Sequence, residues 1–113
     1  MPLISTHTNI GVSREAEKNM KEKLGKAIQL IPGKSEAWLM LEFLEKTPMY
    51  FKGSDAPCAL AEVKIFGRAD KAAYEKLTGA ITQCLSSELA IPADRNYVKY
   101  EEADYWGWNG SNF

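Results

Sequence analysis

Cysteine and histidine are scarce in this chain of 113 residues, which has two cysteines and one histidine. Cys58 and Cys84 form no Cys-x-x-Cys pair, no zinc-ligand spacing and no disulfide framework, and His7 belongs to no metal-ligating cluster. We therefore predict two buried, reduced thiols and no metal site.

The chain also lacks a strong net charge and a long apolar run. Its 14 basic and 15 acidic residues leave a net charge of −1, which is no electrostatic footprint for nucleic acid or for an anionic membrane surface. No apolar run is long enough to span a bilayer, and the N-terminus lacks the charged and apolar regions of a signal peptide. We expect no nucleic-acid partner, no membrane partner and a cytoplasmic location.

What remains is an ordinary globular composition, with 45% hydrophobic and 26% charged residues. The length is that of one domain with a core of its own, so we predict a single domain over residues 1–113.

The first half of the sequence has the pattern strand, helix, strand. A strand is predicted over residues 3–8, and Ser13 stands where a helix N-cap belongs. The helix ends at Pro32-Gly33, and the run "AWLMLEFLE" at 37–45 predicts a strand that is largely buried on both faces. Apolar residues recur at three- and four-residue intervals along the helix: Ala16, Met20, Leu24, Ala27, Ile28 and Ile31.

The second half repeats this order. Residues 58–66 predict a strand, Gly67 ends it, Asp70 caps a second helix, and residues 96–102 predict a further strand. The fold class is therefore α+β in two layers, a tandem β-α-β pseudo-repeat that forms a four-stranded sheet with two helices on one face. The second helix carries the apolar stripe Tyr74, Leu77, Ile81, Cys84, Leu85 and Leu89.

One helical layer cannot cover both faces of such a sheet. In the run 37–45, apolar residues alternate between the two faces, so we expect another subunit to cover the second face. The tail, residues 101–113, is too aromatic to be a flexible end, and we expect it to dock on a neighbouring subunit. The two alternating sets are Leu39, Leu41 and Phe43 against Trp38, Met40 and Leu44.

The first strand begins with a proline directly after the initiator methionine. A proline at the first position of a strand can be structurally neutral, since it costs no internal ladder bond there. The initiator methionine is normally removed before a small residue, however, and the chain would then begin with the free secondary amine of Pro2.

Five separated stretches together resemble the macrophage migration inhibitory factor family of the tautomerase superfamily. They are Pro2 after Met1, Gly33-Lys34, the segment from Gly53 to Leu60, the segment from Asp94 to Tyr97, and "GWNGSNF" at the end. The resemblance implies a homotrimer whose three sheets surround a central channel, with active sites between subunits. It also implies cofactor-independent keto–enol tautomerisation of phenylpyruvate-like aromatic keto acids. Export without a signal peptide stays open as the alternative to a cytoplasmic location.

The resemblance assigns roles by position. Pro2 is the general base, Lys34 binds the substrate carboxylate, and Phe66 offers its backbone N–H. Two departures from the family pattern concern the pocket: Lys99 stands where the better-known mammalian members have an asparagine, and Trp106 replaces a small aliphatic residue. A third is "CALA" at 58–61, which lacks the second sulfur of the family's Cys-x-x-Cys, so we expect no thiol–disulfide exchange. The remaining substrate-binding candidates are Tyr97 from the adjacent subunit, Lys99, Trp38 and Trp108.

Each assignment has a structural alternative. Lys34 could be a solvated lysine after a helix, Tyr97 a cross-strand packing residue, and Lys99 a solvated strand lysine. Trp38 and Trp108 could serve core or interface packing.

For the Pro2 amine we expect a lowered pKa, because burial against Leu3, Phe66 and the aromatic tail and repulsion from Lys34 and Lys99 disfavour the ammonium form. Two functions follow. One is the tautomerase, and the other is a cytokine-like signalling protein that binds a receptor and has a vestigial pocket.

Overall fold

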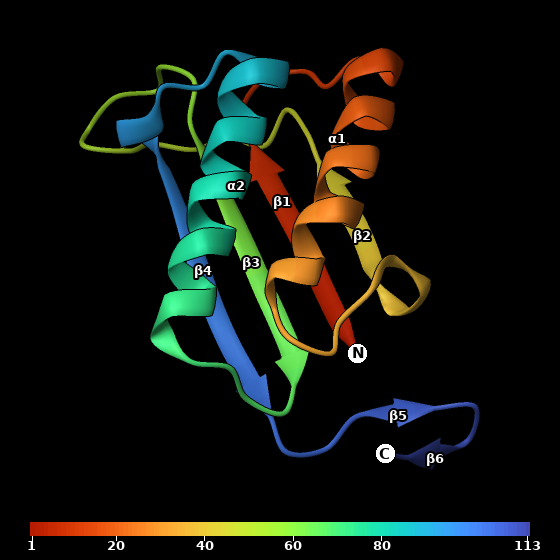
Figure 1. The fold of residues 1–113 in the computed structure, drawn as a ribbon. Helices are drawn as coiled ribbons and strands as arrows, with labels where there is room; N and C mark the ends of the chain where they lie inside the picture. Colours follow the sequence, from red (N-terminus) through yellow and green to blue (C-terminus); the bar gives the residue numbers. More distant parts are fainter.

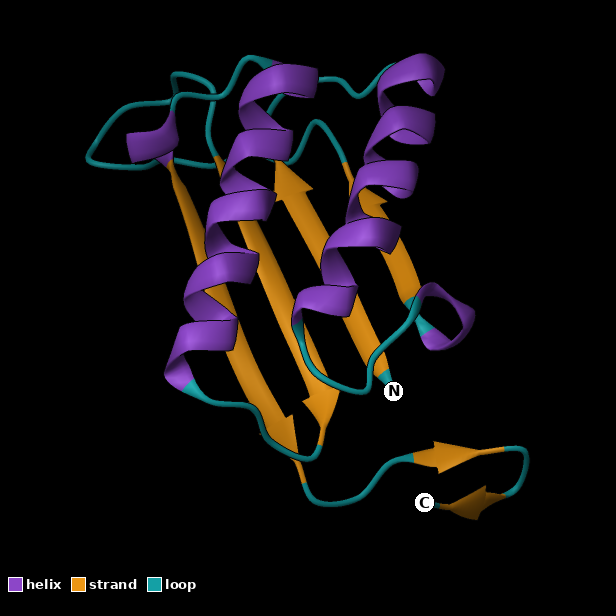
Figure 2. Cartoon of the chain, viewed as in Figure 1, coloured by secondary structure: helices purple, strands orange, loops and turns teal.

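The computed structural model describes residues 1–113 as two layers, with both long helices side by side on one face of a four-stranded sheet (Figures 1 and 2). The helices are α1 (Arg14–Ala27) and α2 (Lys71–Leu89). The strands of the main sheet are β1 (Pro2–Thr8), β2 (Met40–Leu44), β3 (Ala59–Phe66) and β4 (Asn96–Ala103). Three short 3-10 turns are η1 (Ile28–Leu30), η2 (Glu36–Trp38) and η3 (Ala93–Arg95), and a terminal hairpin is formed by β5 (Gly107–Trp108) and β6 (Ser111–Asn112).

The sheet order β2-β1-β3-β4 confirms the predicted tandem of β-α-β units. Strand β2 runs parallel to β1, and β4 runs parallel to β3, while β1 and β3 are antiparallel at the centre. Both predicted caps form, since the side chains of Ser13 and Asp70 accept hydrogen bonds from the backbone N–H groups of Ala16 and Ala73.

The core lies between the helices and the sheet. Alternate residues of β3 point toward the helices and are buried, and both predicted helical stripes pack on them. The largest fully buried apolar side chains include Ile4, Met20, Leu24, Ile28, Val63, Ile65, Leu77, Ile81 and Leu85.

The prediction for residues 37–45 is wrong in two respects. The strand begins only at Met40, because residues 36–38 form the turn η2, so Trp38 lies in a turn. The strand is also not buried on both faces: it is an edge strand, and Met40 is 67% exposed. Since α1 covers one face alone, Leu41 and Phe43 pack on the core while Met40 and Leu44 stay exposed, as expected for the uncovered face.

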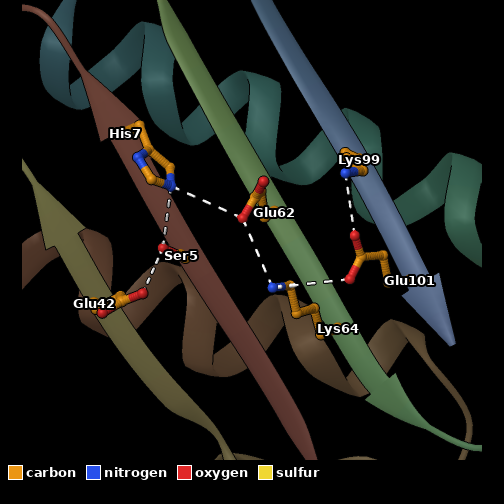
Figure 3. A network of polar contacts seen from close by, with 7 residues as sticks. All are labelled: Ser5, His7, Glu42, Glu62, Lys64, Lys99 and Glu101. Carbon is orange, nitrogen blue, oxygen red and sulfur yellow. Dashed lines mark hydrogen bonds and ion pairs between the residues drawn. The ribbon is translucent and has the colours of Figure 1, made fainter. Parts of the chain in front are cut away.

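The centre of the uncovered face is polar, which the pattern of β2 alone did not predict. Figure 3 shows this face with the helices behind it. Successive side chains of β3 and β4 point to opposite faces, so the charged ones lie on the face away from the core. On that face Lys64 pairs with both Glu62 and Glu101. The exposed apolar residues of the sheet therefore lie at its two edges, Met40 and Leu44 on β2 and Tyr97 on β4, and not across the whole face. The network consists of Ser5, His7, Glu42, Glu62, Lys64, Lys99 and Glu101.

Candidate active site

The start of β1 meets the end of β3 and the turn that follows α1. Pro2 lies opposite Ile65 in the antiparallel ladder, and the Phe66 N–H donates to the Met1 carbonyl at 3.0 Å. Lys34 follows α1, and its Nζ donates to the Phe66 carbonyl at 2.8 Å. Three segments far apart in the sequence thus place a chain terminus, a lysine and a backbone N–H together.

This environment lowers the pKa of the N-terminal amine. Burial, followed by the charge and the hydrogen bond of Lys34, lowers the pKa of the Met1 amino group from 8.0 to about 6. Lys34 thus acts on the Met1 amine in the expected direction, and its effect on the Pro2 amine stays a prediction. The expected repulsion from Lys99 is wrong within one chain, because Lys99 lies on β4 and its Nζ is 3.1 Å from Glu101 Oε1.

A cluster of four aromatic rings, one of them Phe66, lies at this end of the sheet. The rings of Trp38 and Trp108 meet edge to face with centroids 4.9 Å apart, and Phe113 lies 6.0 Å from each of them and 5.9 Å from Phe66. The β5–β6 hairpin holds Phe113 in place through the bond from its N–H to the Trp106 carbonyl. The aromatic tail thus contacts its own chain, and its docking on a neighbour stays a prediction.

Phe113 was missed as a candidate site residue. It is the last residue of the terminal motif "GWNGSNF", and only contacts formed by folding show that it bridges Trp38, Phe66 and Trp108. The recurrence of aromatic residues in that motif is the signal that could have indicated it.

Tyr97 and Lys99 lie elsewhere in the chain. Tyr97 is opposite Leu60, near the start of β3, whereas Pro2 is opposite Ile65, near its end. Lys99 is opposite Glu62. A single chain therefore brings together five of the predicted site residues and leaves these two apart, on the edge strand that a neighbouring chain could meet. The five are Pro2, Lys34, Trp38, Phe66 and Trp108.

The cysteines do not belong to the site. Both are free and buried, as predicted, and burial raises the pKa of Cys84 to about 11, so its thiol stays protonated at neutral pH. The chain holds no group of three or more His, Cys, Asp or Glu side chains that could bind a metal ion. Neither α1 nor α2 has the length and hydropathy needed to cross a membrane.

A mixed sheet of two β-α-β units, with a terminal amine beside a lysine at one end, defines a tautomerase-type fold. The sequence profile of the family described as macrophage migration inhibitory factor (MIF) matches residues 1–113, and the chain belongs to this family. The family includes tautomerase-type and cytokine-like members, and its proteins are commonly homotrimers.

Individual relatives agree over the full length. The macrophage migration inhibitory factor of Meriones unguiculatus is 30% identical over 115 residues, which cover 100% of this chain and 99% of that protein. The crystal structure of Leishmania major MIF2 superposes with a TM-score of 0.94 at 33% identity and covers 100% of this chain and 97% of that one. The homologue from Prochlorococcus marinus has a TM-score of 0.88 at 32% identity, with 98% of each chain covered.

Proposed function

We propose that this protein is a cofactor-independent keto–enol tautomerase of phenylpyruvate-like aromatic keto acids, with the amine of Pro2 as general base once Met1 is removed. The observation that carries the proposal is the meeting of the N-terminus with Lys34 and Phe66, in an environment that lowers the pKa of the Met1 amine to about 6. A base that moves a proton between carbon and oxygen works best when its pKa lies near the working pH. The aromatic cluster of Trp38, Phe66, Trp108 and Phe113 supplies the apolar wall that an aryl group needs.

The reaction needs a base, an anion partner and a donor to oxygen. The neutral amine of Pro2 takes a proton from the carbon next to the carbonyl, and a proton returned at the carbonyl oxygen completes the enol. The Lys34 ammonium pairs with the substrate carboxylate. The reverse order of proton transfers turns the enol into the ketone.

Removal of Met1 changes two groups at once. The Pro2 nitrogen is an amide while Met1 is attached, and an amide nitrogen is no base. The Met1 carbonyl also occupies the Phe66 N–H, so cleavage releases that donor for a substrate oxygen. The methionine therefore blocks both the base and a hydrogen-bond donor of the proposed site.

The proposed assembly is a homotrimer in which Tyr97 and Lys99 of one chain enter the Pro2 site of the next. The separation of Tyr97 from Pro2 within one chain supports this, as does the exposure of apolar side chains on β2 and the tail. In the assembled site, Trp38 and Trp108 form part of the wall.

An ultraviolet assay of phenylpyruvate tautomerisation tests the proposal. The mature protein should be active, and Pro2→Gly should be much less active, because a primary amine on a flexible glycine is a poorly positioned base. A mature, trimeric protein without activity would instead favour the cytokine-like alternative, in which the trimer binds a receptor.

The rate should depend on pH through the terminal amine. We expect kcat/KM to be low under acidic conditions, where the amine is protonated, and to rise to a plateau as the pH passes an apparent pKa well below the ordinary value of 8.0. Burial and Lys34 are the causes, so the Lys34→Ala variant should move the inflection to higher pH. A profile of kcat/KM against pH for both proteins provides the measurement. An inflection at or above 8.0 in the wild type would contradict the lowered pKa.

Lys34→Ala should also weaken the binding of carboxylate substrates selectively. Loss of a charge-assisted contact costs about 1.5–3 kcal/mol, whereas the methyl ester of the same keto acid should lose much less. Lys71→Ala is the matched control, because Lys71 lies on α2 with its side chain 90% exposed. Steady-state kinetics on acid and ester give the comparison, and equal losses for both would remove Lys34 from the carboxylate role.

A further inference from the structure

One arginine outside the proposed site binds the loop between β2 and β3. Arg95 ends the turn η3 directly before β4, and its side chain makes no ion pair. A guanidinium offers five N–H donors in a fixed plane, so one side chain can satisfy several carbonyls of a loop without regular structure. Its Nε donates to the Pro57 carbonyl at 3.1 Å, Nη1 to Phe51 at 2.9 Å, and Nη2 to Ser54 at 3.0 Å and Ala56 at 2.9 Å.

The same guanidinium packs against Phe51, and Phe51 packs against Tyr97. Arg95 Cζ lies 5.4 Å from the centroid of the Phe51 ring, and the rings of Phe51 and Tyr97 are 4.8 Å apart. The turn at Phe51 is closed by two backbone bonds with Ser54, of 2.9 and 3.1 Å. The position of the Phe51 ring is therefore fixed from two directions, by its own turn and by the arginine.

Tyr97 itself has little else to hold it. Its side chain is exposed, with 64% of the residue accessible, and its hydroxyl has no hydrogen-bond partner within the chain. An exposed tyrosine on an edge strand loses rotamer freedom when it is ordered, and this cost falls if a rigid neighbour already restricts the ring. The Phe51 ring is such a neighbour.

We infer that Arg95 is a positioning residue for the tautomerase site: by fixing residues 51–57 it holds Phe51 as the platform on which Tyr97 is oriented. This inference rests on the proposed function, in which the Tyr97 hydroxyl enters the site of the adjacent chain. Arg95 acts only through Tyr97 and touches no substrate. A lysine keeps the charge but cannot form the planar set of bonds to four carbonyls.

A double-mutant cycle tests this pathway. Arg95→Lys should lower kcat/KM about three- to tenfold in the wild-type background, the loss expected for one misplaced neutral hydrogen bond. In the Tyr97→Phe background, which already lacks the hydroxyl, the same change should have less than about a twofold effect. The pH profile should stay unchanged, because Arg95→Lys keeps the positive charge and alters neither Pro2 nor Lys34. Arg14→Lys is the control, since the Arg14 side chain is 96% exposed and contacts neither Phe51 nor Tyr97.

Two further readouts separate positioning from general damage. Hydrogen exchange at the Phe51 and Ser54 amides, which close the turn, should be faster in Arg95→Lys. Phe51→Leu keeps the arginine but removes the aromatic platform. Its loss in kcat/KM should likewise be much smaller in the Tyr97→Phe background than in the wild type.

The inference is overturned if the losses in kcat/KM from Arg95→Lys and Tyr97→Phe multiply in the double variant. It is also overturned if Arg95→Lys changes neither the hydrogen exchange nor the kinetics. Either outcome leaves the proposed function intact. An inactive wild type would instead refute the proposed function, and the inference with it.

Discussion

A protein that keeps Met1 should lose at least about 100-fold in tautomerase activity relative to the mature chain that begins at Pro2. General base catalysis contributes about 10²- to 10⁴-fold, and the Pro2 nitrogen has no basicity while it is part of a peptide bond. The Met1 carbonyl adds to the loss, because it occupies the Phe66 N–H at 3.0 Å. Intact-mass spectrometry identifies the two forms, and the phenylpyruvate assay compares their kcat/KM.

The control for this comparison is mature protein whose terminal amine has been acetylated. It lacks the Met1 side chain but also has an amide at Pro2, so it should be as inactive as the form that keeps Met1. Equal activity in the processed and unprocessed proteins would contradict catalysis by the amine.

Truncation after Tyr105 should abolish most of the activity and reduce the trimer population at the same time. The truncation removes Trp108 and Phe113, half of the aromatic cluster. Trp108 is 53% exposed and Phe113 is 47% exposed, so each contributes about half of the 1.5–3 kcal/mol of a fully buried ring, and a loss of about 10- to 100-fold in kcat/KM is expected. The amine should also become better hydrated, which would raise its pKa toward the ordinary range.

Light scattering and the kinetic assay, both run over a dilution series, measure this effect. Activity and trimer should fall together, because a site that needs Tyr97 from a neighbour exists only in the oligomer. Asp104→Asn, in the exposed start of the tail, is the matched control and should change neither. A fully active monomer would contradict the shared site.

The elements could be predicted from the sequence because their signals are local. Ser13 and Asp70 mark the helix starts, and Gly67 ends the strand before α2 at a φ of 87°. The start of β2 could not be placed, because Trp38 and Leu39 have the strand-like composition of the residues that follow, while the turn at 36–38 depends on tertiary contacts.

The site was only partly predictable for a similar reason. Motif positions indicated Pro2, Lys34 and Phe66, whose proximity the fold then explains through the β1–β3 register and the turn after α1. The contacts of Phe113 and of Arg95 depend on how a hairpin and an irregular loop fold back, and no short-range pattern encodes either.

The antiparallel pairing of β1 with β3 gives the chain an approximate internal two-fold axis. This axis relates Leu3, paired with Met40, to Leu60, paired with Tyr97, so that Pro2 corresponds to Ala59 at the start of β3. The two halves are equivalent as scaffolds but not as chemistry, because only the strand that opens the polypeptide can carry a basic backbone nitrogen. At the related position, Ala59, the nitrogen is locked in an amide. A second β-α-β unit in the same chain therefore cannot create a second amine-dependent site. One chain carries one such site, and a second site requires a second chain.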